Sequence, residues 1–242
     1  MVPGAAVPSA PTGAWRTAVV REVRRSVRPP AVVLRLEVPD RIDHLPGQHY
    51  VVRLTADDGY VAQRSYSVAS SADDPLLELY VERLDDGEVS TFLADVVEVG
   101  DEMTVRGPIG GFFVWDGVTP ALGVAGGSGV VPLVAMLRHA RATGREDLLR
   151  LVVGARTVSR LPYADELRAA GAVTVFSRVG LPGRRPAGRL TVDDLQPVLR
   201  DEGQTVFVCG SSGFAETAGR LLVEAGVPTT AIKVERFGPS GM

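Results

Sequence analysis

The stretch RSYSVASSADD, residues 64–74, lies at the end of a run that is typical of a β-strand, YVAQRSYSV at 60–68. Within four residues it combines a permanent cation, a flat aromatic ring and two hydroxyls, in Arg64, Ser65, Tyr66 and Ser67. A strand end with this chemistry is a candidate ligand site. The runs on either side of it indicate which fold presents that site.

The N-terminal half, from Trp15 to about Val114, consists of short β-rich runs separated by turn residues such as Pro46-Gly47 and Asp58-Gly59. The runs are TAVVREVRRSV (17–27), AVVLRLEV (31–38), QHYVVRL (48–54), YVAQRSYSV (60–68), LLELYVERL (76–84) and EMTVRG (102–107). Six antiparallel strands at this spacing predict a small closed barrel. One short helix, EVSTFLADV (88–96), is expected between the last two of these runs.

The C-terminal half changes rhythm after Pro120, where apolar runs alternate with helical stretches such as VVPLVAMLRHARATG (130–144). The apolar runs are ALGVAG (121–126), LLRLVVGA (148–155), VTVFS (173–177), TVFVCG (205–210) and TAIKVE (230–235). This alternation predicts a parallel α/β sheet covered on both faces, with its ligand site at the carboxyl ends of the strands.

The composition excludes several classes of protein. Of 242 residues, 45% are hydrophobic and 23% are charged, a globular composition without a membrane span. The net charge of −3 gives no general attraction to nucleic acid. We expect residues 1–13 to be a disordered tail of a cytoplasmic protein, since their prolines interrupt any apolar signal core. The expected domains are 14–116 and 117–242, divided within WDGVTP (115–120).

Metal and thiol chemistry have little support in the sequence. Cys209 is the only cysteine, so this chain forms neither an intrachain disulfide nor a cluster held by four of its own thiolates. His44, His49 and His139 lack metal-ligand spacing, and we expect no metal site. Ser128 lies in GGSGV rather than in a GxSxG elbow, so a hydrolase has no support at that point.

A glycine-rich turn, GVAGGSGVVPLVAML (123–137), joins the first apolar run of the second half to a helix. Backbone amides and the positive end of a helix make such a turn a binding place for a diphosphate. The spacing of Gly126, Gly127 and Gly129 differs from GxGxxG, so it is not that fingerprint. A tight strand-to-helix turn without any ligand is the alternative.

Two arginines, Arg156 and Arg178, follow different apolar runs and should project at the same edge of the sheet. A guanidinium donates two hydrogen bonds to a phosphate monoester, which favours NADPH over NADH. Arg184, Arg185 and Arg189 lie just beyond and would extend the basic patch. The alternative is that each arginine is simply solvated.

Together these segments resemble the ferredoxin–NADP reductase family of flavoenzymes, from about Trp15 to Phe237. The family's R-x-Y-S motif matches Arg64, Tyr66 and Ser67. Its other motifs follow in order, as PGQ (46–48), Gly87-x-x-Ser90-Thr91, GPIGGFF (107–113), GGSGVVP (126–132) and VFVCGSSGF (206–214). The resemblance implies an FAD-binding barrel followed by a Rossmann-like NAD(P)-binding domain.

The resemblance also implies roles for residues on the barrel. Arg64 would bond the FAD diphosphate, Tyr66 would stack on the isoalloxazine, and Ser67 would lie near the flavin N5. The N-terminus of the short helix, with Gly87 and the Ser90 and Thr91 hydroxyls, would be the second support for the diphosphate.

For the second domain, the resemblance implies that Gly127, Ser128 and Gly129 hold the nicotinamide diphosphate and that Gly210 lies beside the nicotinamide. Ser67, Cys209 and Glu235 would surround the place where hydride passes from the nicotinamide to the flavin. For Cys209, a small residue inert in the core is the alternative. Phe237 falls where relatives carry a terminal aromatic near the flavin, but here GPSGM follows it, and plain packing is its alternative.

The resulting hypothesis is an FAD-dependent oxidoreductase that takes hydride from NADPH, or from NADH, and passes electrons to a separate acceptor. That acceptor would be a ferredoxin, a flavodoxin or an oxygenase component, with the enzyme itself a monomer. One alternative is a reductase of free flavin or of another small molecule. A non-catalytic flavin-binding regulatory subunit is the second alternative.

Overall fold

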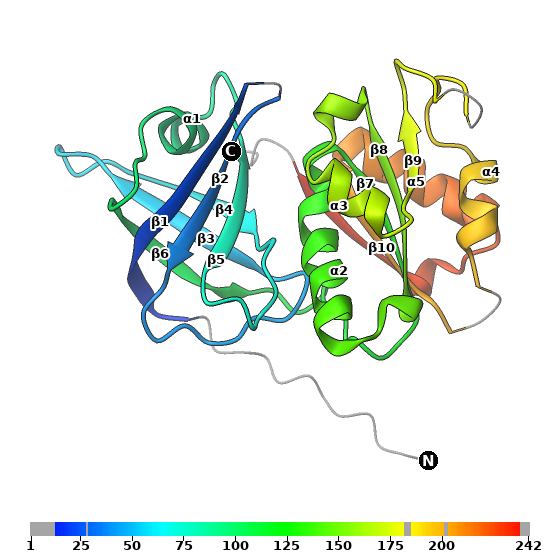
Figure 1. Cartoon of the computed structure of the whole chain (residues 1–242), viewed down its shortest axis with the longest axis horizontal. Coiled ribbons are helices and arrows are strands. Elements are labelled where there is room, and N and C mark those ends of the chain that lie inside the picture. The colour runs from blue at the N-terminus through cyan, green and yellow to red at the C-terminus, as the bar shows by residue number, and fades with distance from the viewer. Residues whose placement is uncertain (1–12, 28, 182–184, 201–202, 238–242) are drawn as a thin grey trace, which may run out of the picture.

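The computed structural model describes residues 13–27, 29–181, 185–200 and 203–237, which form two domains side by side (Figure 1). The first domain is one antiparallel sheet of six strands in the order β4-β3-β6-β1-β2-β5. Its strands are β1 (Trp15–Val27), β2 (Pro30–Glu37), β3 (His49–Thr55), β4 (Val61–Ser67), β5 (Leu77–Glu82) and β6 (Glu102–Ile109). An isolated bridge between Val68, which follows the edge strand β4, and Leu79 of the other edge strand, β5, closes the sheet into a barrel. The expected six-stranded barrel is confirmed.

Alternation of side chains decides which face of each barrel strand is buried. In β5, Leu77, Leu79 and Val81 are fully buried in the barrel core. The residues between them, Glu78, Tyr80 and Glu82, therefore point to the other face, toward the second domain. Helix α1 (Glu88–Asp95) lies over one end of the barrel and buries Val89 and Leu93 in the same core.

The second domain is a parallel sheet of five strands in the order β11-β10-β7-β8-β9, as expected for an α/β domain. Its strands are β7 (Ala121–Gly126), β8 (Leu149–Ala155), β9 (Val173–Phe176), β10 (Thr205–Ser211) and β11 (Ile232–Phe237). The α-helices are α2 (Val131–Thr143), α3 (Ala164–Ala169), α4 (Val192–Leu195) and α5 (Ser212–Glu224). Helices α2 and α3 share one core with the sheet, whereas α4 and α5 pack on its opposite face.

The described residues of this domain also form five short 3-10 turns, η1 (Gly127–Val130), η2 (Glu146–Leu148), η3 (Val158–Arg160), η4 (Gln196–Val198) and η5 (Thr229–Ala231). The glycine-rich stretch thus forms a 3-10 turn before α2 begins. No helix in the described part of the chain is long and apolar enough to cross a membrane.

The segment between β6 and β7 joins the two domains closely. The Trp115 backbone N–H donates to the Pro46 carbonyl on the barrel, and its indole N–H donates to the Thr119 carbonyl at 2.7 Å. Gly47 has a φ of +104°, and a Cβ there would lie 2.0 Å from the Phe113 carbonyl oxygen. Only glycine permits this close approach, so the PGQ segment fixes the barrel against the joining segment.

Candidate functional site

A cleft of about 1,030 Å³ lies between the two domains and is lined by residues of both. The carboxyl ends of β7, β8 and β10 contribute to its wall, as expected for a parallel α/β sheet. Many of the residues singled out in the sequence line this cleft, among them Arg64, Tyr66, Ser67, Gly87, Ser90, Gly127, Ser128, Arg156, Glu235 and Phe237. The two halves of the candidate site therefore face one common space.

Strand β4 supplies the barrel wall of the cleft. Arg64 is exposed, and within the described part of the chain its guanidinium donates only to the neighbouring Gln63 carbonyl, at 2.8 Å. Among the described residues no carboxylate lies within ion-pair distance of it. The Tyr66 ring is half-buried against the barrel core, and this burial raises the pKa of its hydroxyl, which stays neutral. Strand β4 thus presents an unpaired cation and a fixed aromatic ring together.

The start of helix α1 forms the next part of the barrel wall. No side chain caps this helix at Gly87, where a Cβ would lie 2.4 Å from the Ser90 hydroxyl. The Ser90 hydroxyl donates to the Gly87 carbonyl and accepts from the Leu84 N–H, at 3.0 and 3.2 Å. The Thr91 hydroxyl donates to the Leu84 carbonyl, and Thr91 does not line the cleft. Both hydroxyls therefore shape the turn that precedes the uncapped helix start.

The glycine-rich turn forms the opposite wall. Gly127 has a φ of +58°, and apart from its own chain neighbours no atom of the described residues lies within 4 Å of where its Cβ would be. Gly129 does not line the cleft, because a Cβ there would lie 2.4 Å from the Cys209 carbonyl oxygen of β10. The turn is therefore packed tightly against the sheet on one side and open to the cleft at Gly127 and Ser128. No side chain caps it.

Cys209 and Glu235 are neighbours in the parallel pairing of β10 with β11. Cys209 is fully buried in the core that includes α2, and neither it nor Gly210 lines the cleft. Burial, together with the Glu235 charge, raises the pKa of the Cys209 thiol, so the thiol stays protonated. The structure therefore places Cys209 behind the cleft wall, in the apolar core. This is the position expected of a small core residue without a role in catalysis.

Glu235 does line the cleft, and burial raises its pKa to about 7. A carboxyl with this pKa exchanges its proton near neutral pH, which is the range in which an acid–base group is useful. Ser67, on the barrel side of the same cleft, is almost fully buried. Phe237, the last residue of β11, lines the cleft and also packs against the α2 core.

The arginines predicted to bind a phosphate monoester separate into two groups. Arg156 and Arg189 line the cleft, but Arg178 does not, although its backbone N–H donates to the Arg156 carbonyl at 3.0 Å. Arg185 forms a bidentate ion pair with Asp194, at 2.6 and 2.8 Å, so it holds its own loop together. Arg184 lies outside the described residues.

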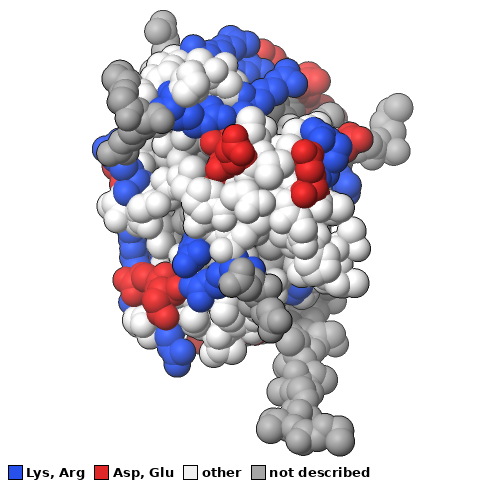
Figure 2. Space-filling model, turned by 90° about the vertical axis from the view of Figure 1, so that its right-hand side faces the viewer, with Lys and Arg blue, Asp and Glu red and all other residues white. Residues whose placement is uncertain are grey.

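Arg160 and Arg236 line the cleft as well and were not predicted. Figure 2 shows the face of the second domain turned away from the barrel, where many of the basic side chains form a band at the top of the view. That is the edge at which the β9 arrow ends in Figure 1. The carboxyl edge of the sheet is therefore the basic side of this domain.

Two aromatic residues of the cleft were also missed. Tyr80 lines it from β5, and the alternation of LELYVE could have indicated that Tyr80 and Glu82 share the outer face. Phe214, in the first turn of α5, lies under the glycine-rich turn, where a Cβ on Gly126 would be 2.6 Å from its ring. No local signal marks Phe214, because its contact with β7 depends on the tertiary fold.

The barrel wall suits FAD by its own chemistry. It offers an unpaired guanidinium for a diphosphate, a fixed aromatic plane for the flavin ring and an uncapped helix start for phosphate oxygens. In the described part of the chain no group of three or more His, Cys, Asp or Glu side chains could hold a metal ion.

Comparison with protein families gives two matches, one to each of the two domains seen in the structure. Residues 19–114 match the oxidoreductase FAD-binding domain, and residues 124–220 match the oxidoreductase NAD-binding domain. Among curated proteins, the reductase component of propane 2-monooxygenase from Rhodococcus jostii is 30% identical over 213 residues. That match covers 82% of this chain but only 57% of the relative, so the chain spans little more than half of its length.

Solved structures show the same fold. The FAD/NAD-binding domain of a nitric oxide dioxygenase from Vibrio cholerae superposes with a TM-score of 0.80 at 24% identity, covering 95% of this chain and all of that one. An Amycolatopsis cytochrome P450 reductase gives a TM-score of 0.77 at 27% identity, covering 95% of this chain and 72% of that one. With both domain families matched in order, this chain belongs to the ferredoxin–NADP reductase-like flavoenzymes, the oxidoreductases with an FAD-binding and an NAD-binding domain.

Proposed function

We propose that the protein is an FAD-dependent NAD(P)H oxidoreductase that uses NADPH in preference to NADH and delivers electrons to a separate acceptor protein. One observation carries this proposal: the cleft joins a barrel wall suited to FAD with a second wall suited to a dinucleotide. The FAD-binding unit would comprise residues 14–116 and the nicotinamide-binding unit residues 117–242.

On the barrel wall, Arg64 would hold the FAD diphosphate and Tyr66 would support the flavin ring. The uncapped start of α1, shaped by Gly87, Ser90 and Thr91, would supply backbone amides to the phosphate oxygens. When bound, FAD supplies the chemistry of accepting hydride from a reduced nicotinamide and releasing electrons to an acceptor. The role of the chain is to bring two flat rings together and to keep them oriented.

On the second wall, Gly127 and Ser128 would hold the nicotinamide diphosphate through the backbone. Arg156, with Arg160 and Arg189 nearby in the same cleft, would bind the phosphate monoester that distinguishes NADPH from NADH. Ser67 and Glu235 would hold or move protons at the place where the rings meet. Glu235 is suited to this by its pKa of about 7.

A protein acceptor is supported by the relatives, several of which are reductase or electron-transfer components of oxygenase systems. This chain has one cysteine and cannot itself hold a cluster on four thiolates. The acceptor would therefore be a separate ferredoxin, flavodoxin or oxygenase component.

The test is steady-state oxidation of NADPH by the FAD-loaded protein with two acceptors, an iron–sulfur ferredoxin and free flavin, at low and high salt. We expect reduction of the ferredoxin at a rate that falls as salt increases, because charged surfaces steer such encounters. Rapid reduction of free flavin with no transfer to any protein acceptor would instead indicate a small-molecule reductase.

A further inference from the structure

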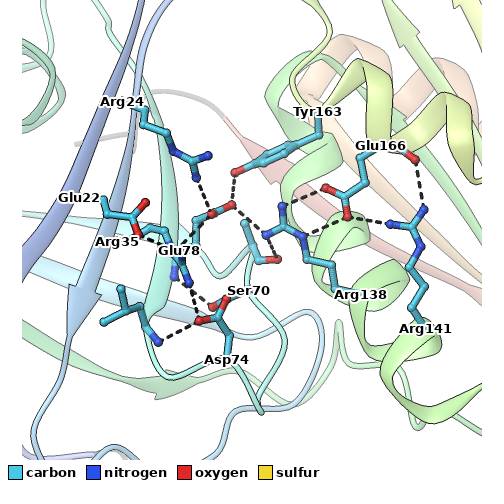
Figure 3. Close-up of polar contacts among 12 residues, drawn as sticks. Glu22, Arg24, Arg35, Ser70, Asp74, Glu78, Arg138, Arg141, Tyr163 and Glu166 are labelled. Carbon is cyan, nitrogen blue, oxygen red and sulfur yellow. Dashed lines mark hydrogen bonds and ion pairs between the residues drawn. The ribbon is translucent and has the colours of Figure 1, made fainter.

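A buried carboxylate of the barrel, Glu78, lies at the contact between the domains and does not line the cleft. Glu78 is 4% exposed and belongs to the outward face of β5. It accepts hydrogen bonds from Arg138 of α2 at 2.8 Å and from the Tyr163 hydroxyl at 2.9 Å, both in the second domain (Figure 3). Arg24 of the barrel donates to it as well, at 2.9 Å. One barrel side chain thus joins two elements of the other domain.

Arg138 is the central cation of this contact. It donates to Glu78 and to the Ala69 carbonyl of the barrel, and bidentately to Glu166 of α3 at 3.1 and 2.9 Å. Burial disfavours its charge, but the hydrogen bonds to Glu166 and Glu78 outweigh burial and raise its pKa. Because all three guanidinium nitrogens are used, Arg138 holds α3 and β5 at a fixed separation.

Tyr163 connects this contact to the wall of the cleft. Its ring lies 5.1 Å from the Arg138 guanidinium and 5.9 Å from the ring of Tyr80, which lines the cleft from β5. Its φ of +57° is in the left-handed region, which a tyrosine adopts only when surrounding contacts hold it there. The two residues that line the cleft just before it are Arg160 and Pro162.

We propose that Glu78 is a positioning residue for the nicotinamide dinucleotide: through Tyr163 and Arg138 it fixes the segment 156–163 of the second domain across the cleft from the barrel. This inference rests on the proposed function. The segment carries Arg156 and Arg160, the candidate contacts to the phosphate monoester, and the Glu78–Tyr163 bond sets where that segment lies relative to Tyr80.

Among Glu78, Arg138 and Tyr163, substitution of Glu78 should disturb the contact between the domains most, because several cations surround its charge. Arg24 and Arg138 both bond its carboxylate, and Arg35 lies 3.9 Å from it. Glu78→Gln keeps the shape but leaves these cations without the charge they surround, and a buried cation without a partner is unfavourable. Tyr163→Phe removes one hydroxyl and no charge, so it is the milder variant.

The experiment compares Glu78→Gln, Tyr163→Phe and a matched control, Glu37→Gln, in FAD-loaded protein. Glu37 pairs with Arg21 on the exposed barrel surface. We expect the KM for NADPH to rise about tenfold in Glu78→Gln, with kcat and flavin content unchanged, because misplaced contacts weaken binding. The rise should be smaller in Tyr163→Phe and absent in Glu37→Gln.

A second readout does not depend on turnover. The Arg160 and Leu161 amides donate to the Thr157 and Val158 carbonyls at 3.1 Å, and their hydrogen exchange reports on the segment directly. We expect faster exchange there in Glu78→Gln and Tyr163→Phe than in the wild type and Glu37→Gln. Unchanged exchange and unchanged KM in a folded Tyr163→Phe or Glu78→Gln variant, even with a lower melting temperature, would overturn the proposal.

The wild-type protein separates this inference from the proposed function. If its bound flavin is not reduced by NADPH, the proposed function fails, and with it the assignment to the nicotinamide dinucleotide. The exchange comparison would then still decide whether Glu78 fixes the segment 156–163.

Discussion

The two walls of the cleft present different chemical surfaces. The barrel wall presents side chains from one strand, with the Arg64 cation beside a Tyr66 ring packed on the core. The second wall presents the open backbone of Gly127 and Ser128, with arginines such as Arg156 around it. On the proposed function, the barrel wall would therefore be a fixed surface for an aromatic group, whereas the second wall would be an open surface for phosphates.

This difference matches a retained cofactor on one side and an exchanging substrate on the other. A ring packed against a fixed aromatic plane buries a large apolar area, which favours long residence. Exposed arginines and backbone amides bind phosphates through contacts that water and salt can replace. We therefore expect the barrel wall to determine flavin content and the second wall to determine the Michaelis constant.

The largest expected effect is on the barrel wall. Arg64→Ala should weaken FAD binding roughly ten- to hundredfold, because a charge-assisted hydrogen bond contributes about 1.5–3 kcal/mol. The flavin-to-protein ratio after purification and dialysis measures this. Its matched control is Gln63→Ala, at the neighbouring exposed position, which should keep its flavin. Full flavin occupancy in Arg64→Ala would remove the contrast between the walls.

The second effect concerns Glu235, whose pKa is raised to about 7 by burial. A carboxyl with a raised pKa in the folded state stabilises the fold at low pH, and this contribution is lost as pH rises through the folded value. Between about pH 5 and pH 8 the free energy of unfolding should fall about 2 kcal/mol more in the wild type than in Glu235→Gln. Denaturant titrations at a series of pH values measure it, and parallel curves would contradict the raised pKa.

The smallest effect separates two arginines that look alike in the sequence. Arg156→Ala should raise the KM for NADPH about tenfold and that for NADH little, because one phosphate contact is lost. Arg178→Ala is the matched control, because Arg178 does not line the cleft. Steady-state kinetics with both donors decide the matter, and equal effects of the two substitutions would show that the second wall is not selective at Arg156.

Much of the fold could be predicted because period-two alternation and apolar runs report burial directly. For example, the apolar run ALGVAG coincides with strand β7. In LELYVE, which forms β5, the apolar residues at every second position are the ones that are buried in the barrel core. The motif around Arg64 and Tyr66 could also be placed, since its position at a strand end limits which side of the barrel it faces.

Other parts of the site depend on tertiary geometry that sequence spacing does not carry. Both faces of β10 are covered, so its apolar run does not reveal whether Cys209 faces the cleft or the core. Arg156 and Arg178 follow neighbouring strands, but only the backbone path after each strand decides which side chain reaches the cleft. Tyr163 and Glu78 are 85 residues apart, and their contact arises only when the domains pack together.

The visible spectrum of the purified protein under anaerobic conditions, before and after a stoichiometric amount of NADPH, tests the account most directly. We predict a flavin spectrum that survives dialysis and is then bleached by NADPH, and more slowly by the same amount of NADH. A flavin spectrum that neither nucleotide changes would contradict the assignment of the two walls to one reaction.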